Sequence, residues 1–414
     1  MALVVVLALE AGAYVGLWLV PSPETLETAP PQAETEPLGI APYLAAEMLH
    51  PFLGYVWNPE MDHAELERVA HGLHVTPFGF IDDSDVLPRR GPHTAVVAVT
   101  GGSFACQLSV HAKEMLRQRI RALPGLAGKD VRIVTVALGG YKQPQQLFAV
   151  GYLLAAGASF DVVINLDGFN EVALAATDNV PAGVSVLYPR AWPFRVGGAD
   201  PQRAALTGKI AYLREWRTRA VAFAQGRPQR YSAVARLAAR LWRRRASAEI
   251  DGLQRQLVEG AGRAAGAAAL GPPTPGGDGL DTAVDVWRRG SRLLAGLCAA
   301  NGIRYFHFLQ PNQYVDGSKP MSADERRLAI EPAHPYRPAV AAGYPKLIAS
   351  GRELSTEGVA FADLTRALAD HTETLYADSC CHLSPRGYEV VAAAMIAFME
   401  GHWEQSRASR LSSR

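Results

Sequence analysis

The sequence has few cysteines, almost no net charge and no internal repeat. Four cysteines in 414 residues are too few for a disulfide scaffold or for a metal site built from several thiolates. The 41 Lys and Arg residues balance 40 Asp and Glu residues, which leaves a net charge of +1. This balance excludes a polyelectrolyte and argues against a protein that binds nucleic acid along its whole length. The length suits two or three domains, or one enlarged domain.

Lys and Arg are also absent ahead of Arg68, and this part of the chain begins with a long apolar run. Residues 2–20 are apolar except for Glu10 and are long enough to cross a bilayer as a helix. Their ten Leu and Val residues favour insertion by about 3–6 kcal/mol in sum, against a cost of about 2.5–3.5 kcal/mol for Glu10. We therefore predict a membrane anchor over residues 1–20, with the remainder extracytoplasmic. A cleaved signal peptide and a buried helix of a soluble protein are the alternatives.

Two further segments have a biased composition. Residues 21–39 are rich in Pro and Glu, which predicts an extended tether. Residues 40–414 are expected to form one domain, with an Arg- and Ala-rich insertion at about 176–280. Apolar residues at helical spacing within 234–241, surrounded by arginines, predict a basic amphipathic helix in this insertion. That helix fits a solvated surface, a contact with anionic lipid head groups or, less well, nucleic acid.

From residue 95 onwards, short β-branched runs alternate with longer helical patterns. This alternation predicts parallel strands joined by crossover helices. Strands are expected at 95–99, 131–136, 160–166 and 303–309, with a weaker one at 359–364. Helices are expected near 104–122, 144–157, 282–300 and 385–402. The predicted fold is a three-layer α/β/α sandwich with a mainly parallel sheet.

Three of the expected strands end in turns that contain glycine. The first runs into GGS at 101–103, the second into LGGY at 138–141 and the third into DGFNE at 167–171. The carboxyl ends of parallel strands form one edge of a sheet, where active sites are built. Ser103 at a helix N-terminus suits a nucleophile, while the Gly140 N–H and the Asn170 amide suit an oxyanion hole. Taken singly, each residue also fits a structural role as an N-cap, a helix-entry glycine or a turn asparagine.

Two loops supply the remaining candidates. In the loop 377–385 (ADSCCHLSP), His382 can act as a general base, with the nearby Asp378 carboxylate fixing its tautomer. The segment LQPNQY follows the fourth strand at the same edge of the sheet. Its polar residues are expected to line an acyl or sugar pocket, unless they form an ordinary polar loop; they are Gln310, Asn312 and Gln313.

In their order along the chain, these segments resemble the sequence blocks of the SGNH (GDSL-like) hydrolase family. The upstream segment HPFLGYVWNP, at 50–59, is similar to the lead-in of its membrane-anchored bacterial members. VVAVTGGSFA is similar to the first block with GGS in place of GDS, VALGGYKQPQQL to the second, VVINLDGFNE to the third and DSCCHLSPRGYEVVA to the last. The resemblance implies a flavodoxin-like fold and Ser103 as the nucleophile. It also implies an oxyanion hole made by Ser103, Gly140 and Asn170, and His382 as the base.

The sequence departs from the family pattern at the acid. The family places this residue three positions before the histidine, whereas Asp378 lies four positions before His382. Asp378 is therefore one candidate for the acid. The alternatives are Asp363, at the end of the weak fifth strand, and a Ser–His dyad oriented by a backbone carbonyl.

These expectations combine into a membrane-tethered serine esterase that needs no metal or organic cofactor. Its substrate is expected to be a short acyl ester, such as an O-acetyl group on a cell-envelope or exported carbohydrate, with no nucleic-acid partner. Two alternatives stay open: a carbohydrate O-acetyltransferase that uses the same site, and a non-catalytic envelope or carbohydrate-binding module. In an exported protein, Cys298 could also pair with Cys380 or Cys381.

Overall fold

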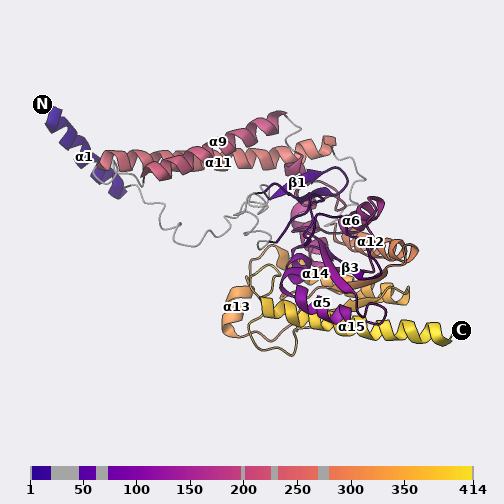
Figure 1. Ribbon diagram of the computed structural model, residues 1–414. Coiled ribbons are helices and arrows are strands. Elements are labelled where there is room, and N and C mark those ends of the chain that lie inside the picture. Colours follow the sequence, from indigo (N-terminus) through magenta and orange to yellow (C-terminus); the bar gives the residue numbers. More distant parts are fainter. Residues whose placement is uncertain are drawn as a thin grey trace. The chain divides into compact units, whose positions relative to one another are not determined.

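The structure is a computed structural model that describes residues 2–19, 46–61, 73–196, 201–224, 232–268 and 279–412 (Figure 1). The tether predicted at 21–39 lies outside these residues. The chain forms two compact units. The first contains Met1–Ile40 and Pro193–Ala268, and the second contains Ala41–Trp192 and Ala269–Arg414. The insertion expected at about 176–280 is thus divided between the two units.

The first unit is helical. Its helices α1 (Ala2–Leu19) and α9 (Pro201–Ala224) both pack against α11 (Ala233–Ala268), which contains the predicted basic helix. Glu10 of α1 accepts hydrogen bonds from the Ser232 hydroxyl and from the Ala233 N–H, so its carboxylate caps the start of α11. None of the helices that the structure describes is both long and apolar enough to cross a membrane.

A five-stranded parallel sheet forms the centre of the second unit. Its spatial order is β4-β3-β5-β6-β7, with the strands at β3 (Thr94–Gly101), β4 (Asp130–Ala137), β5 (Val162–Asp167), β6 (Arg304–Leu309) and β7 (Phe361–Asp363). Each strand begins and ends within two residues of its predicted position. Most strand residues are apolar because helices cover both faces, and the strand order is consistent with a flavodoxin-like fold.

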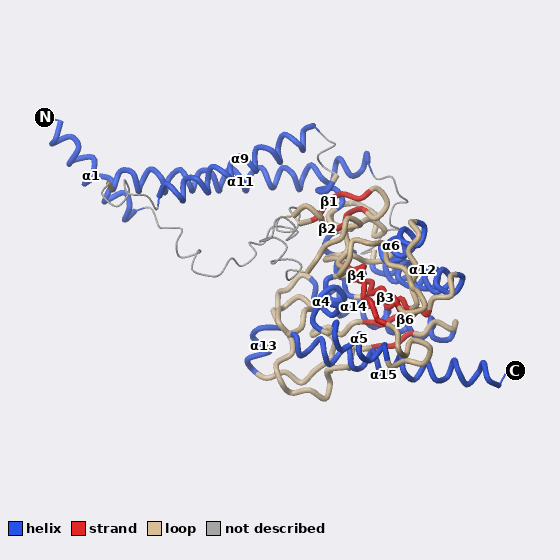
Figure 2. The backbone as a smooth tube through the Cα atoms, viewed as in Figure 1, coloured by secondary structure: helices blue, strands red, loops and turns tan. Residues whose placement is uncertain are grey.

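Helices flank the sheet in two layers (Figure 2). One layer contains α4 (Ser103–His111), α5 (Lys113–Arg121) and α15 (Pro385–Ser412); the other contains α6 (Gln145–Ala155), α12 (Leu280–Ala300) and α14 (Tyr336–Thr356). Because crossovers between parallel strands are right-handed as a rule, the reversal in strand order at β3 accounts for helices on opposite faces of the sheet. The α/β architecture predicted from the sequence is confirmed. However, the helix expected at 104–122 is interrupted at Ala112, and the pattern does not reveal α14, which contains Pro345.

Short elements complete the second unit around the carboxyl edge of the sheet. They are the antiparallel hairpin β1 (Glu47–His50) and β2 (Gly54–Trp57), α7 (Phe169–Leu174) with its continuation η2 (Ala175–Asn179), and α13 (Ala323–Ala329). The short helix α8 (Trp192–Arg195) contains the point in the sequence at which the two units divide. The loops that follow β3 and β6 form hydrogen bonds with the turn ahead of α15 at this edge, and the loops that follow β4 and β5 meet beside the loop after β3. This convergence positions the candidate site.

Candidate active site

Ser103 lies at the sharp turn between β3 and α4. Gly101 has a φ of +144°, and a Cβ atom there would lie 2.1 Å from the Leu166 carbonyl oxygen, so the turn requires glycine. Gly102 is the N-cap of α4, which makes Ser103 the first helical residue and not the capping residue. The Ser103 hydroxyl instead donates a hydrogen bond to His382 Nε2 at 2.8 Å. The turn therefore places the Ser103 hydroxyl next to a histidine that lies 279 residues further along the sequence.

Asp378 and His382 lie in one tight turn ahead of α15. The Ala377 N–H donates to the His382 carbonyl at 2.9 Å and closes this turn. Asp378 Oδ1 accepts the three successive N–H groups of residues 380–382 at 2.9, 3.0 and 3.1 Å. Its Oδ2 accepts from His382 Nδ1 at 2.5 Å. The backbone curls around the carboxylate, so the four-residue spacing still completes a hydrogen-bond chain from Ser103 to Asp378.

Asp378 determines the charge and the tautomer of His382. Burial alone would raise the pKa of Asp378, but the hydrogen bond and charge of His382, with the backbone N–H donors, hold it below its usual value. Burial alone would lower the pKa of His382, but Asp378 and the neighbouring Cys380 raise it above its usual value. The ionised carboxylate keeps Nδ1 protonated and leaves Nε2 to accept a proton from Ser103.

The second candidate acid lies elsewhere. Asp363 ends β7, and its Oδ1 accepts the Thr365 N–H at 2.9 Å. The contact with His382 Nδ1 belongs to Asp378. Of the alternatives that the sequence leaves open, the geometry therefore favours Asp378.

The loop after β6 holds the same turn by its backbone carbonyls. Three successive side chains donate to three successive carbonyl groups: Asn312 Nδ2 to Cys380 at 3.3 Å, Gln313 Nε2 to Asp378 at 3.1 Å and Tyr314 OH to Ser379 at 2.7 Å. Gln310 and Asn312 have exposed fractions of only 3% and 0%. Asn312 thus positions the turn, while the substrate contact predicted for Gln310 and Asn312 stays a prediction.

A buried ion pair, which the sequence does not signal, fixes the start of this turn. The side chains of Lys319 and Glu325 are both fully buried, with Nζ and Oε2 2.6 Å apart. The second oxygen, Glu325 Oε1, accepts the N–H groups of Leu375 and Tyr376 at 2.8 and 2.9 Å. A buried charge is costly unless it is paired and hydrogen-bonded, and here both conditions are met. This ion pair thus anchors the backbone that leads into Asp378.

Asn170 lies against the backbone that carries Ser103. Its Nδ2 donates to the Tyr141 carbonyl at 2.8 Å. A Cβ atom on Gly102 would lie 2.1 Å from this Nδ2 and 3.2 Å from the Tyr141 carbonyl oxygen. The amide has two N–H donors, so the bond to Tyr141 leaves one available. The turns after β3, β4 and β5 thus meet at one point, as their strand-end positions predict.

Gly140 occupies the turn after β4. Its φ of +80° favours glycine, and a Cβ atom there would lie 2.5 Å from Arg190 Cδ and 3.0 Å from the Tyr55 hydroxyl oxygen. Tyr55 in turn donates to the Gly139 carbonyl at 2.7 Å. Sequence reasoning does not single out Arg190 or Tyr55, because their contact with this turn depends on segments distant in the chain.

Glu171 joins the turns that carry Gly140 and Asn170. Its Oε1 accepts the Gln143 N–H and its Oε2 accepts the Gly168 N–H, both at 2.9 Å. Burial, with the charge of Asp167, raises the pKa of Glu171 to about 8, and the backbone donors act against this rise. The role of Glu171 is to hold the two turns together.

A second Ser–His–Asp hydrogen-bond chain lies inside the same unit. Ser291 Oγ is 2.8 Å from His307 Nδ1, and His307 Nε2 is 2.8 Å from Asp167 Oδ1. Trp287 Nε1 and Asn165 Nδ2 also donate to the Asp167 carboxylate, at 2.6 and 2.7 Å. The His307 and Asp167 side chains are 0% and 1% exposed, so this chain is closed to a substrate.

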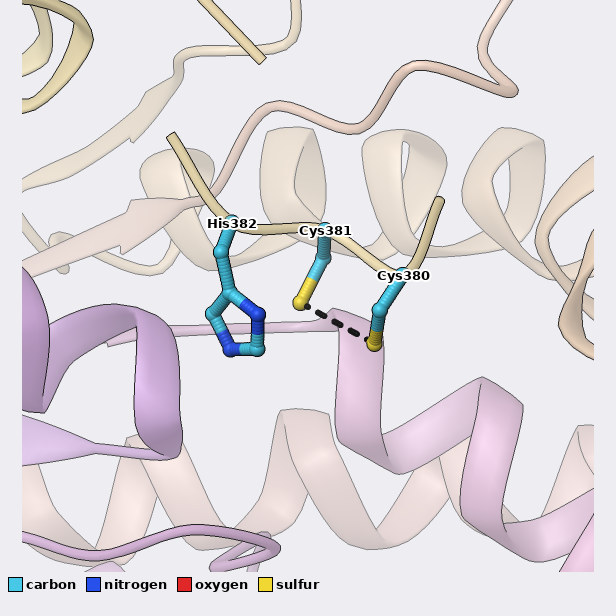
Figure 3. A group of neighbouring side chains, drawn as sticks. All are labelled: Cys380, Cys381 and His382. Atoms are coloured by element: carbon cyan, nitrogen blue, oxygen red, sulfur yellow. Dashed lines mark hydrogen bonds between the residues drawn. The ribbon is translucent and has the colours of Figure 1, made fainter. Parts of the chain in front are cut away.

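All four cysteines are free thiols, so Cys298 pairs with neither Cys380 nor Cys381. Among the described residues, one group of metal-ligand side chains is clustered: Cys380, Cys381 and His382, whose ligand atoms lie within 4.8 Å of one another (Figure 3). Both ring nitrogens of His382 are already in hydrogen bonds, with Ser103 and Asp378. We therefore describe this group as two thiols beside the triad histidine.

The fold and the site together define a class of protein: an α/β protein with a hydrogen-bonded serine, histidine and aspartate at the carboxyl edge of a parallel sheet. Neither the models of known protein families nor the curated proteins include a match to this sequence. The chemistry must therefore be argued from the site itself. Its residues can deprotonate a serine hydroxyl and can donate hydrogen bonds to an oxyanion.

Proposed function

We propose that the protein is a serine esterase of the SGNH type. The observation that supports this most directly is the hydrogen-bond chain from Ser103 through His382 to Asp378, with distances of 2.8 and 2.5 Å. The His382 and Asp378 side chains are 19% and 41% exposed, so a substrate can reach these hydrogen-bonded residues from solvent. The order of the sequence segments that resemble the SGNH family supports the same proposal.

In the proposed reaction, His382 Nε2 takes the hydroxyl proton as Ser103 Oγ attacks the ester carbonyl carbon. The N–H groups of Ser103 and Gly140 and the free Asn170 N–H donate to the oxyanion. His382 then gives its proton to the departing alcohol oxygen. A water molecule, deprotonated by the same imidazole, releases the acid and restores Ser103. Asp378 stays ionised and stabilises the imidazolium in both steps.

The proposed substrate is a short acyl ester, such as an O-acetyl group on a cell-envelope or exported carbohydrate. This part of the proposal is supported by the family resemblance. Residues 1–20 are proposed to anchor the chain in a membrane with the esterase outside the cytoplasm, on the strength of the apolar run and the absence of Lys and Arg ahead of Arg68. Alkaline carbonate extraction of cell membranes tests the anchor: the full chain should stay in the pellet, and its release would contradict anchoring.

The enzymatic proposal is tested with the purified full chain in mild detergent. Hydrolysis of p-nitrophenyl esters of increasing acyl length is compared with that of Ser103→Ala, with Ser291→Ala as the matched control. We expect turnover by the unmodified chain and by Ser291→Ala, and none above background for Ser103→Ala. Equal rates for the unmodified chain and Ser103→Ala would overturn the proposal. Adding a carbohydrate acceptor distinguishes transfer from hydrolysis, because transfer yields acylated sugar in place of free acid.

A further inference from the structure

Two adjacent thiols separate the acid of the triad from its base. Cys380 and Cys381 lie between Asp378 and His382 in the tight turn, with their Sγ atoms 3.6 Å apart (Figure 3). Cys380 is half-buried, and Cys381 is buried with an exposed fraction of 1%. Neither sulfur has a part in the proposed reaction.

Both polar groups of the peptide bond between these cysteines form hydrogen bonds that position the triad. Its N–H, from Cys381, donates to Asp378 Oδ1 at 3.0 Å. Its carbonyl, from Cys380, accepts from Asn312 Nδ2 at 3.3 Å. Rotation of this one peptide group would therefore remove a donor from the acid and a support from the turn.

We propose that Cys380 and Cys381 form a reversible vicinal disulfide that switches the esterase off; this regulation rests on the proposed function. A disulfide needs its sulfurs about 2.05 Å apart, so the two Sγ atoms must approach each other. The Cα atoms of adjacent residues are only about 3.8 Å apart, below the 4.4–6.8 Å usual for disulfides. The ring that closes includes the Cys380–Cys381 peptide group, which must rotate to accommodate the bond. Rotation breaks the hydrogen bond from Cys381 N–H to Asp378.

The oxidant in this step is a small-molecule or protein disulfide, as oxidising compartments supply. The Cys380 thiolate attacks one sulfur of the oxidant and expels the other as a thiol, which leaves a mixed disulfide on Cys380. The Cys381 thiol then loses its proton and attacks the Cys380 sulfur, releasing the second thiol. Two protons and two electrons leave the protein, and one disulfide is reduced to two thiols.

The surroundings of the two sulfurs suit this order of events. The hydrogen bond between the thiols and the charge of His382 lower the pKa of Cys380, the more exposed of the pair. Burial raises the pKa of Cys381 well above its usual value. Cys380 is thus the thiol that an external disulfide meets first. Cys381 is assigned the resolving step because its Sγ lies only 3.6 Å from that of Cys380.

The test exposes the reduced full chain to oxidised glutathione and then to dithiothreitol. Three quantities are measured in each state: the mass of the peptide that contains both cysteines, kcat/KM for the p-nitrophenyl ester, and amide hydrogen exchange over residues 375–385. We expect the loss of two hydrogens within the peptide, faster exchange and a fall in kcat/KM of about 10- to 100-fold, as for a catalytic group displaced by about 1 Å. Dithiothreitol should reverse all three changes.

Matched variants test whether the changes in mass, exchange and kcat/KM come from Cys380 and Cys381. The ratio of reduced to oxidised activity should fall to about one in Cys380→Ala, which can form neither the mixed disulfide nor the disulfide with Cys381. It should stay at the value of the unmodified chain in Cys298→Ala, which removes a buried cysteine of α12. Thiols that stay reduced, or a disulfide that leaves both exchange and activity unchanged, would overturn the switch. An inactive reduced chain that still shows the disulfide and the faster exchange would instead overturn the esterase proposal and keep the redox-sensitive turn.

Discussion

Two hydrogen-bond chains of the same three residue types lie in one unit, and they differ in exposure. In the chain from Ser103 to Asp378, the histidine and aspartate side chains are 19% and 41% exposed. In the chain from Ser291 to Asp167, the corresponding values are 0% and 1%. The serine-to-histidine distance is 2.8 Å in both. A Ser–His–Asp chain with good geometry is therefore not in itself an active site.

The backbone around each serine differs as well. Ser103 begins α4, where the first N–H groups of a helix have no intrahelical partner, and the Asn170 amide lies alongside. Ser291 lies in the middle of α12, where the helix uses the backbone N–H groups internally. The first serine is thus surrounded by donors that suit an oxyanion, whereas the second contributes only its hydroxyl to a buried polar network.

The strongest test of this difference replaces each histidine in turn. His382→Ala should lower kcat by about 10⁴-fold or more, because the base and the charge pair are lost together, and should leave the thermal midpoint nearly unchanged. His307→Ala should cost about 1–3 kcal/mol of unfolding free energy, because the buried Ser291 hydroxyl and Asp167 carboxylate each lose a hydrogen-bond partner. Ester hydrolysis and urea unfolding of both variants measure the two effects. If His307→Ala lowers kcat of the folded protein as much as His382→Ala does, the assignment of roles is wrong.

The second-largest effect is expected from replacing the acid of the triad. Asp378→Asn should reduce kcat by about 10²- to 10⁴-fold, while Asp363→Asn should leave it unchanged, since Asp363 does not contact His382. The raised pKa of His382 places the acid limb of kcat/KM above the usual histidine value, because the protonated imidazole cannot accept the Ser103 proton. Asp378→Asn replaces the charged acceptor of His382 Nδ1–H, which raises this pKa, by a neutral amide, so the acid limb should move to lower pH. A limb that does not move would exclude Asp378 as the partner of the base.

Two asparagines allow a further comparison. Asn170→Ala removes an oxyanion donor and should lower kcat by about 10²-fold with little change in KM. Asn165→Ala leaves Thr100 Oγ1 and Asp167 without the buried amide, and should cost about 1–3 kcal/mol of stability with kcat retained. Steady-state kinetics and chemical denaturation separate the two outcomes. A large loss of kcat in Asn165→Ala alone would contradict the proposed oxyanion hole.

The smallest expected effect concerns the support of the turn. Tyr314→Phe removes one hydrogen bond, to the Ser379 carbonyl, and should lower kcat/KM by a few-fold, equivalent to about 1 kcal/mol. Tyr305→Phe, whose hydroxyl contacts Ser291 in the buried chain, is the matched control and should leave kcat/KM unchanged. Equal losses in both variants would indicate a general effect on stability, which thermal unfolding would show directly.

The sequence predicts those features that have local signals. The strands appear as short apolar runs, and the turns that hold Ser103, Gly140 and Asn170 follow them directly, so their convergence at one edge is expected. The placement of Asp378 is different, because it depends on how residues 377–382 curl around one carboxylate oxygen. Spacing alone therefore leaves the acid open.

Contacts between segments far apart in the chain explain what sequence reasoning does not reveal. The Ser291–His307–Asp167 chain joins α12 to two strands, and Glu325 reaches 50 residues along the chain to Leu375. No periodicity or motif encodes such pairings. The sequence pattern fails to predict the helix α14 for a different reason: it contains Pro345, and proline usually ends a helix.

The central claim is that Ser103, and not Ser291, is an activated nucleophile. The most direct measurement is labelling of the full chain with a fluorophosphonate, followed by mapping of the modified peptide by mass spectrometry. We expect one adduct, on Ser103, that is absent in Ser103→Ala, much slower in His382→Ala and unaffected in Ser291→Ala. The absence of any adduct on the folded protein, or labelling that persists in Ser103→Ala, would contradict the account.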